Sequence, residues 1–268
     1  MEEIIQEKKR IDMVKLKKTG AIVLPSIFTI ANMGFGFFAI LLASELKFVQ
    51  ASWFIMISYV MDMLDGRVAR LVHGESSFGV EIDSLSDWMS FGIAPAYLVY
   101  KLVLKDYGMW SYPVAFLYVL CGALRLARYN VKSHFGGSSK DYFQGLPIPG
   151  AAGVLVSFVL AYSMLEGEGG ARNIRFVMEL MPYVCAAIPF IMVALALLMV
   201  SSAPYAAFKG DMVKLNSLKG ILMITAILSV VVAYPQDALF VIFALYALSG
   251  VIVGIYKALR GTPKVKEV

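Results

Sequence analysis

Long apolar runs recur along this chain and constrain its fold more than any other feature. They are about 20 residues long, the length one helix needs to cross a bilayer. They do not alternate between apolar and polar residues, as the strands of a membrane barrel would. The chain is 59% hydrophobic and only 16% charged, whereas about a quarter of a soluble domain is charged. The sequence therefore predicts an all-α, polytopic helical membrane protein.

We expect eight membrane spans, and an even number places both termini on one side. Only five of the 24 Lys and Arg residues fall in the connections on the opposite side. Because positive residues concentrate on the cytoplasmic side, we expect a protein of the cell membrane with both termini in the cytoplasm. The expected spans cover residues 21–43, 48–70, 80–104, 109–130, 146–165, 177–200, 217–234 and 236–258.

Residues 1–19 interleave basic and apolar side chains. This pattern favours an amphipathic segment on the membrane surface, although a solvated tail would look similar. The net charge of +5 indicates anionic lipid headgroups and not nucleic acid. The two cysteines, Cys121 and Cys185, lie inside expected spans and imply neither a disulfide nor a metal pair.

Four aspartates sit at the cytoplasmic ends of the second and third spans, where an unpaired carboxylate is costly. Asp62 and Asp65 are three residues apart, and Asp83 and Asp87 are four apart. Each pair therefore shares one helix face. A short turn, 74–77, joins the two helices as antiparallel neighbours. We expect all four carboxylates to converge on one small volume.

Two divalent cations would neutralise four converging carboxylates. Oxygen-only ligands suit Mg²⁺, Mn²⁺ or Ca²⁺ better than zinc, and paired metals commonly assist phosphoryl transfer. The surrounding residues fit a phosphate-bearing substrate. Gly66, Ala69 and Gly79 would let a ligand approach the helix backbones, while Arg70 and Ser76 could bind phosphate oxygens.

The full spacing runs Asp62-x2-Asp65-Gly66-x2-Ala69-Arg70-x8-Gly79-x3-Asp83-x3-Asp87. It resembles the complete signature of the CDP-alcohol phosphotransferase family. Members are integral membrane enzymes that transfer a phosphatidyl or similar group from a CDP-linked donor to an alcohol, with release of CMP.

The resemblance implies that the four aspartates bind two metals and that Asp87 is the base. It further implies that Gly66, Arg70 and Ser76 contact the CDP-lipid, and that the protein is a homodimer. The six-span family core would cover residues 20–200. Residues 201–268 would then form two additional transmembrane helices and a basic cytoplasmic tail, without an assigned role.

Three further stretches narrow the choice of acceptor: Ser90–Ala96, Ala123–Asn130 and Phe143–Gly150. They resemble the integral membrane phosphatidylserine synthases of bacteria and archaea. That resemblance implies CDP-diacylglycerol as the donor and L-serine as the acceptor.

Two arginines and one glutamine are candidates for binding the acceptor or the phosphate of the donor. Arg125 and Arg128 lie three residues apart at the cytoplasmic end of the fourth span. One would hold the donor phosphate and the other the serine carboxylate; simple anchoring by positive charge is the alternative. Gln144 is a candidate for polar contact with substrate, although the Pro147 and Pro149 region could simply direct the chain into span five.

The expected mechanism is a direct displacement, in which Asp87 takes the proton as the serine hydroxyl attacks the β-phosphorus. Other acceptors remain open, namely glycerol 3-phosphate or an inositol phosphate, and so does an ether-lipid donor. From a different class, a cation transporter would also place acids in the membrane. Its acids, however, would be expected to continue across the bilayer, whereas these cluster at one face.

Overall fold

The structure is a computed structural model that describes residues 26–72, 77–134, 142–166, 175–206 and 235–259. These residues are almost entirely helical, which confirms the all-α prediction. The exception is a pair of three-residue strands, β1 (Tyr142–Gln144) and β2 (Pro204–Ala206), which are antiparallel. The helices are Ser26–Ser44, α2 (Phe48–Val72), α3 (Ser77–Asp87), α4 (Ala94–Leu102), α5 (Ser111–His134), α6 (Ile148–Glu166), α7 (Arg175–Val200) and α9 (Pro235–Leu259).

The third expected span is one unbroken helical stretch of three parts. Between α3 and α4 lies a π-helical turn, η1 (Trp88–Ile93), which begins directly after Asp87. A 3₁₀ segment, η2 (Leu104–Trp110), then leads into α5. π-turns inside α-helices occur frequently at functional sites.

Six expected spans and the last one match helices to within about five residues at either end. The expected span 217–234 lies outside the described residues. Within the described part of the chain, three helical segments are long and apolar enough to cross a membrane: Ser26–Ser44, Leu104–Ser133 and Pro182–Val200. The chain is thus an integral membrane protein, and the total of eight spans stays a prediction.

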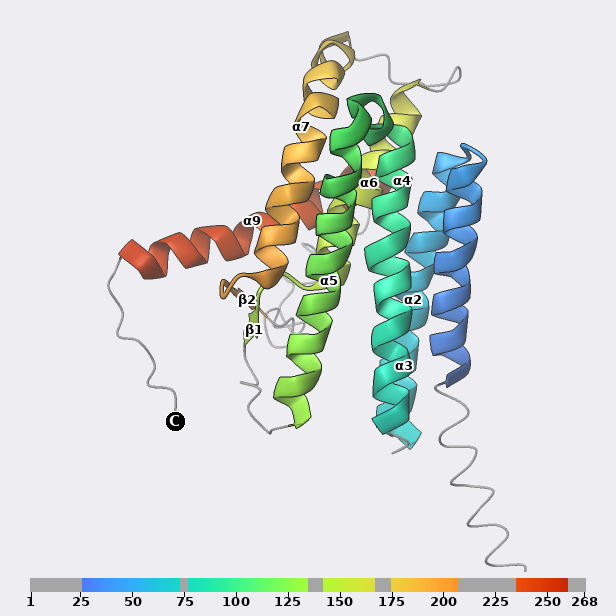
Figure 1. The fold of residues 1–268 in the computed structure, drawn as a ribbon, viewed down its shortest axis with the longest axis vertical. Helices are drawn as coiled ribbons and strands as arrows, with labels where there is room; N and C mark the ends of the chain where they lie inside the picture. Colours follow the sequence, from blue (N-terminus) through green and yellow to red (C-terminus); the bar gives the residue numbers. More distant parts are fainter. Residues whose placement is uncertain (1–25, 73–76, 135–141, 167–174, 207–234, 260–268) are drawn as a thin grey trace, which may run out of the picture.

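Helix α6 lies at the centre of the bundle. Residues 150–160 are buried without interruption, as expected for a helix that is apolar on all sides. The helices α2, α4, α5 and α7 run roughly parallel to one another around it (Figure 1). Their outer faces expose large apolar side chains such as Phe116 and Phe190, which suits contact with lipid.

The Ser26–Ser44 helix packs tightly against the helix that carries Asp83 and Asp87. Ser86 Oγ donates to Thr29 O at 3.0 Å, and Ser90 Oγ donates to Asn32 O at 2.9 Å. A Cβ added at Gly36 would lie 2.8 Å from the Ser90 Cα. Small residues and serine hydroxyls are typical of helix contacts within membranes.

Helix α9 runs across the bundle and projects beyond α7 (Figure 1). Its crossing point on α6 is made of glycines: the Tyr246 ring meets Gly150, and the Phe243 ring meets Gly153. The sequence predicts this helix correctly as 236–258, but gives no sign that it lies across its neighbours.

Candidate functional site

Three of the four predicted carboxylates meet at one point. One oxygen each from Asp62, Asp83 and Asp87 lies within 4.8 Å of the others. Asp62 comes from α2, and the other two come from successive turns of α3. Only residues 73–76 separate α2 from α3 in the sequence. The two helices are therefore neighbours, and their aspartates lie close together.

Asp65 completes the cluster from one turn further along α2. It is only 5% exposed. Its charged neighbours are Asp62 and Asp83, and the Thr29 side chain is its hydrogen-bond partner. The structure therefore places all four aspartates in one region, with Asp65 the most deeply buried.

None of the described Lys and Arg side chains forms an ion pair with the cluster. The one ion pair that they form joins Lys47 and Glu45, far from the aspartates. Two carboxylate oxygens, Asp65 Oδ2 and Asp83 Oδ1, are buried and have no hydrogen-bond partner among the described residues. Buried carboxylate oxygens without partners are costly, and a bound divalent cation would satisfy them. The all-oxygen ligand set therefore fits a hard cation such as Mg²⁺ or Mn²⁺.

Asn32 orients Asp87 from the facing helix. Its Nδ2 donates to Asp87 Oδ1 at 3.3 Å. The backbone carbonyl of Asn32 accepts hydrogen bonds from Ser58 and Ser90, which fixes its position. From the sequence, Asn32 is only a polar residue within an apolar span, which we expect either to hydrogen-bond a neighbouring helix or to line the cavity.

Tyr59 lies one helical turn before Asp62 and was not predicted from the sequence. Its hydroxyl donates to the carbonyl of Pro149 at the start of α6. Its ring packs on Phe91 with a centroid distance of 4.5 Å. Tyr59 thus links α2 to α6 and η1 beside the carboxylates. Its spacing of three residues from Asp62 was the available signal.

The small residues of the motif behave differently from one another. A Cβ added at Gly66 would have no heavy atom within 4 Å, so this side of α2 is open beside the aspartates. Ala69 and Gly79 are both half-buried, on α2 and α3. The backbone of Arg70 is helical and belongs to α2, while the predicted contact at Ser76 lies outside the described residues.

Arg128 has other partners than those expected for a substrate-binding residue. Its guanidinium donates to the carbonyls of Val200 at 2.6 Å, Gln144 at 2.9 Å, Met199 at 3.0 Å and Ser201 at 3.3 Å. These carbonyls include the last ones of α7, which lack partners within the helix. The side chain of Arg128 therefore caps α7 and ties it to β1.

Gly145 makes this clamp possible. It has a positive φ of 81°, and a Cβ there would lie 2.6 Å from Arg128 Nη2. Its N–H donates to Ala203 O at 2.9 Å. The Gln144 side chain is exposed, and its Oε1 accepts from Lys132. The stretch before span five thus serves at least to fix how the chain enters α6.

Arg125 is the predicted arginine whose electrostatic neighbours include an aspartate of the cluster. It is half-exposed, on α5, and its charged neighbours are Asp87 and Arg128. Its guanidinium carbon lies 5.9 Å from the centre of the Tyr129 ring. Of the two predicted arginines, Arg125 thus interacts electrostatically with Asp87, whereas backbone carbonyls engage Arg128.

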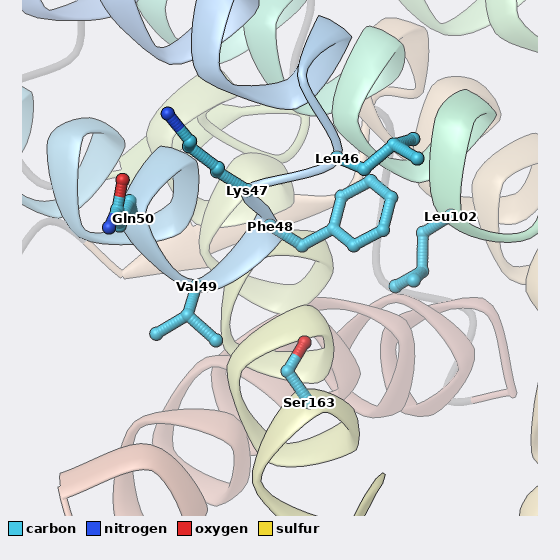
Figure 2. Close-up of a pocket in the computed structure, with 7 residues that line it drawn as sticks. All are labelled: Leu46, Lys47, Phe48, Val49, Gln50, Leu102 and Ser163. Atoms are coloured by element: carbon cyan, nitrogen blue, oxygen red, sulfur yellow. The ribbon is translucent and has the colours of Figure 1, made fainter. Parts of the chain in front are cut away.

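A separate pocket of about 380 Å³ lies at the opposite end of α2. It is lined by the turn between the first helix and α2, together with Leu102 and Ser163 (Figure 2). Phe48 lines it, and Asp62 is 14 residues further along the helix, about 21 Å away. This pocket is distinct from the aspartate cluster and holds no carboxylate.

Comparison with known proteins agrees with the motif. The family model for CDP-alcohol phosphatidyltransferase matches residues 22–200. The chain is 38% identical over 232 residues to the CDP-diacylglycerol–serine O-phosphatidyltransferase of Helicobacter pylori, covering 85% of this chain and 89% of the relative.

Two further relatives match a shorter part of the chain. The archaetidylserine synthase of Methanothermobacter thermautotrophicus is 41% identical over 157 residues, or 56% of this chain and 64% of the relative. The CDP-diacylglycerol–serine O-phosphatidyltransferase of Mycobacterium bovis is 36% identical over 158 residues, or 58% and 54%. The aspartate cluster, the motif spacing and the family match together show that this chain belongs to the CDP-alcohol phosphatidyltransferase family.

Proposed function

We propose that this protein transfers the phosphatidyl group of CDP-diacylglycerol to the hydroxyl of L-serine, giving phosphatidylserine and CMP. The observation that carries the proposal is the meeting of Asp62, Asp83 and Asp87 within 4.8 Å, inside a complete family motif. The names of the relatives support the acceptor, because serine is the alcohol named for the Helicobacter pylori and Mycobacterium bovis proteins.

The four aspartates would hold two divalent cations, Mg²⁺ or Mn²⁺, with Ca²⁺ as a further hard cation of suitable chemistry. The buried, unpartnered oxygens of Asp65 and Asp83 support this assignment. When bound, such cations neutralise the charge of the donor's pyrophosphate and of the departing CMP. Gly66, Ala69 and Gly79 leave room for the CDP group against the helix backbones, with Arg70 and Ser76 as further contacts.

Asp87 acts as the general base. Asn32 holds Asp87 Oδ1 by a hydrogen bond of 3.3 Å, which leaves Oδ2 to accept the proton of the serine hydroxyl. The hydroxyl oxygen forms a bond to the β-phosphorus. The bond from that phosphorus to the bridging oxygen breaks, and CMP leaves with its electron pair.

Arg125 binds the serine carboxylate. A zwitterionic acceptor brings a carboxylate to a site that already contains four, so a cation must hold it. Arg125 interacts electrostatically with Asp87. The guanidinium of Arg128, in contrast, donates to four backbone carbonyls. Arg128 and Gln144 would then stabilise the structure around the site without contacting substrate.

The site lies on the cytoplasmic side of the cell membrane in this proposal, and both termini lie there too. The uneven distribution of Lys and Arg supports this orientation. Serine would enter from water, while the acyl chains stay in the bilayer. Residues 20–200 would form the catalytic core of a homodimer, with 1–19 on the membrane surface and 201–268 as an addition.

The test is CMP release by purified protein in detergent with CDP-diacylglycerol and Mn²⁺. Serine, glycerol 3-phosphate and inositol phosphate are supplied separately. Asp87→Asn is compared with Asp106→Asn, which makes the same change at an exposed aspartate in η2. We expect serine-dependent release that is lost only in Asp87→Asn.

The other outcomes separate the alternatives. Release with a phosphorylated acceptor in place of serine would keep the reaction class and refute the acceptor. CMP release with an archaeal ether-linked CDP-lipid, measured in parallel, shows whether the enzyme accepts ether-linked donors as well as diacylglycerol donors. Folded protein that binds Mn²⁺ but releases no CMP under any of these conditions would refute the enzyme and favour a cation transporter.

A further inference from the structure

Helix α9 lies outside the region that the family model matches, residues 22–200, yet it is built into the catalytic core. A Cβ at Gly150 would lie 2.9 Å from the Tyr246 ring, and one at Gly153 would collide with Phe243. Close approaches of this kind require glycine, so α6 is shaped to receive α9.

A second set of contacts fixes α9 along its own axis. The Tyr205 hydroxyl donates to Ala247 O at 3.0 Å, and its ring packs on Tyr246 with a centroid distance of 5.6 Å. Tyr205 is fully buried against Gly250 of α9. It belongs to β2, which follows the end of α7 that Arg128 caps.

These contacts bring α9 to the edge of the aspartate site. Phe243 packs on Tyr59 at 5.7 Å between ring centres, and Tyr59 lies one turn before Asp62. Tyr246 is an electrostatic neighbour of Arg125, as is Asp87. Arg125 thus interacts electrostatically both with an aspartate of the cluster and with a tyrosine of α9.

We propose that α9 forms one wall of the acceptor site, and that Tyr246 positions Arg125 to receive the carboxylate of the acceptor. The inference rests on the proposed function and extends it to a helix outside the family core. An arginine side chain has many rotamers. A phenol fixed between Gly150 and Tyr205 limits those of Arg125 and orients its N–H groups toward the space above Asp87. Tyr246 is therefore a positioning residue that acts through Arg125.

The test compares Tyr246→Phe with Tyr183→Phe, the same change at an exposed tyrosine of α7. Steady-state CMP release is measured against serine and against CDP-diacylglycerol separately. Phenylalanine keeps the ring contacts with Gly150 and Tyr205, so the fold is preserved. We expect Tyr246→Phe to raise the KM for serine about five- to tenfold, the size of effect expected when one polar contact is lost, with the donor KM and kcat within about twofold of wild type.

Ethanolamine, which lacks the carboxylate, supplies a readout that a purely structural role would not change. The preference for serine over ethanolamine, as a ratio of kcat/KM, should fall in Tyr246→Phe and in Arg125→Gln, and stay unchanged in Tyr183→Phe.

An unchanged serine KM and preference in Tyr246→Phe would overturn the inference while leaving the proposed function intact. Equal losses with both substrates would also overturn it, because they indicate a structural role alone. Absence of serine-dependent release from folded wild-type protein would overturn the proposed function, and the inference with it.

Discussion

At Gly36, one added methyl group should disturb the helix contact that positions Asn32 and Asp87. It faces Ser90, three residues beyond Asp87 and hydrogen-bonded to Asn32. Gly34, two residues earlier in the same helix, has no heavy atom within 4 Å of an added Cβ. The two glycines therefore form a matched pair: Gly36→Ala meets a neighbouring backbone, and Gly34→Ala meets open space.

The magnitude follows from the distances. A Cβ at Gly36 would lie 2.8 Å from the Ser90 Cα, whereas carbon atoms pack at about 3.5–4.0 Å. No rotamer can relieve a clash with a Cα, so the helices must separate. Overpacking of this kind costs about 1–3 kcal/mol, and loss of the hydrogen bond from Ser90 to Asn32 adds about 1 kcal/mol. We expect Gly36→Ala to lower the free energy of unfolding by about 2–4 kcal/mol.

Thermal unfolding of purified protein in detergent measures the effect. A loss of this size should lower the Tm by roughly 4–16 °C. Gly34→Ala should leave it unchanged or raise it slightly, because alanine favours the helix. Residual CMP release should fall in Gly36→Ala even below its Tm, since Asn32 and Asp87 shift with the interface. Equal melting of both variants would refute the close approach of the two helices.

Three other predictions follow from the site. Gly66→Ala should melt like wild type, because its Cβ meets no protein atom, yet raise the KM for CDP-diacylglycerol several-fold by blocking the backbone; an unchanged donor KM would refute the role of Gly66. Arg128→Lys should lower the Tm, because a lysine cannot replace the fork that holds four carbonyls, and should leave the serine KM unchanged; a raised serine KM with a normal Tm would return Arg128 to the acceptor site. Removal of divalent cations by EDTA should abolish CMP release and lower the Tm, since saturating metal at about 100 times its Kd stabilises by about 2.7 kcal/mol; an equal Tm with and without Mn²⁺ would argue against a metal site at Asp62, Asp65, Asp83 and Asp87.

The sequence predicts those features that depend on local spacing. Apolar run length locates six consecutive helices and the last one, because long apolar runs of this kind favour helices that bury or expose apolar faces. The carboxylates converge as expected because Asp62, Asp83 and Asp87 sit on helices separated by only a few residues. For such neighbours, helical periodicity alone determines which side chains share a face.

Features that depend on distant contacts could not be predicted in the same way. The capping of α7 by Arg128 requires knowing that residues 199–201 end beside α5, more than 70 positions away. The placement of Tyr246 requires the crossing of α9 over α6, which glycine at 150 and 153 allows but does not specify. The π-turn after Asp87 has no periodic signal in the sequence, since Ser90, Phe91 and Gly92 are buried one after another.

The π-turn η1 bears on how insertions and deletions would be tolerated. Each residue of an α-helix turns the chain by about 100°, so the extra residue taken up by a π-turn shifts which sequence positions before and after it lie on the same face. Asp83 and Asp87 can therefore face α2 while Leu98 and Val99 of α4 are buried completely. Deleting one residue from 88–93 would remove the wide turn and leave a regular α-helix, with the carboxylate pair and the buried face of α4 both kept in place. Deleting one residue from the α-helical residues 77–87 or 94–102 would instead rotate one face against the other by about 100°, so within this span a deletion should be tolerated best in the π-turn.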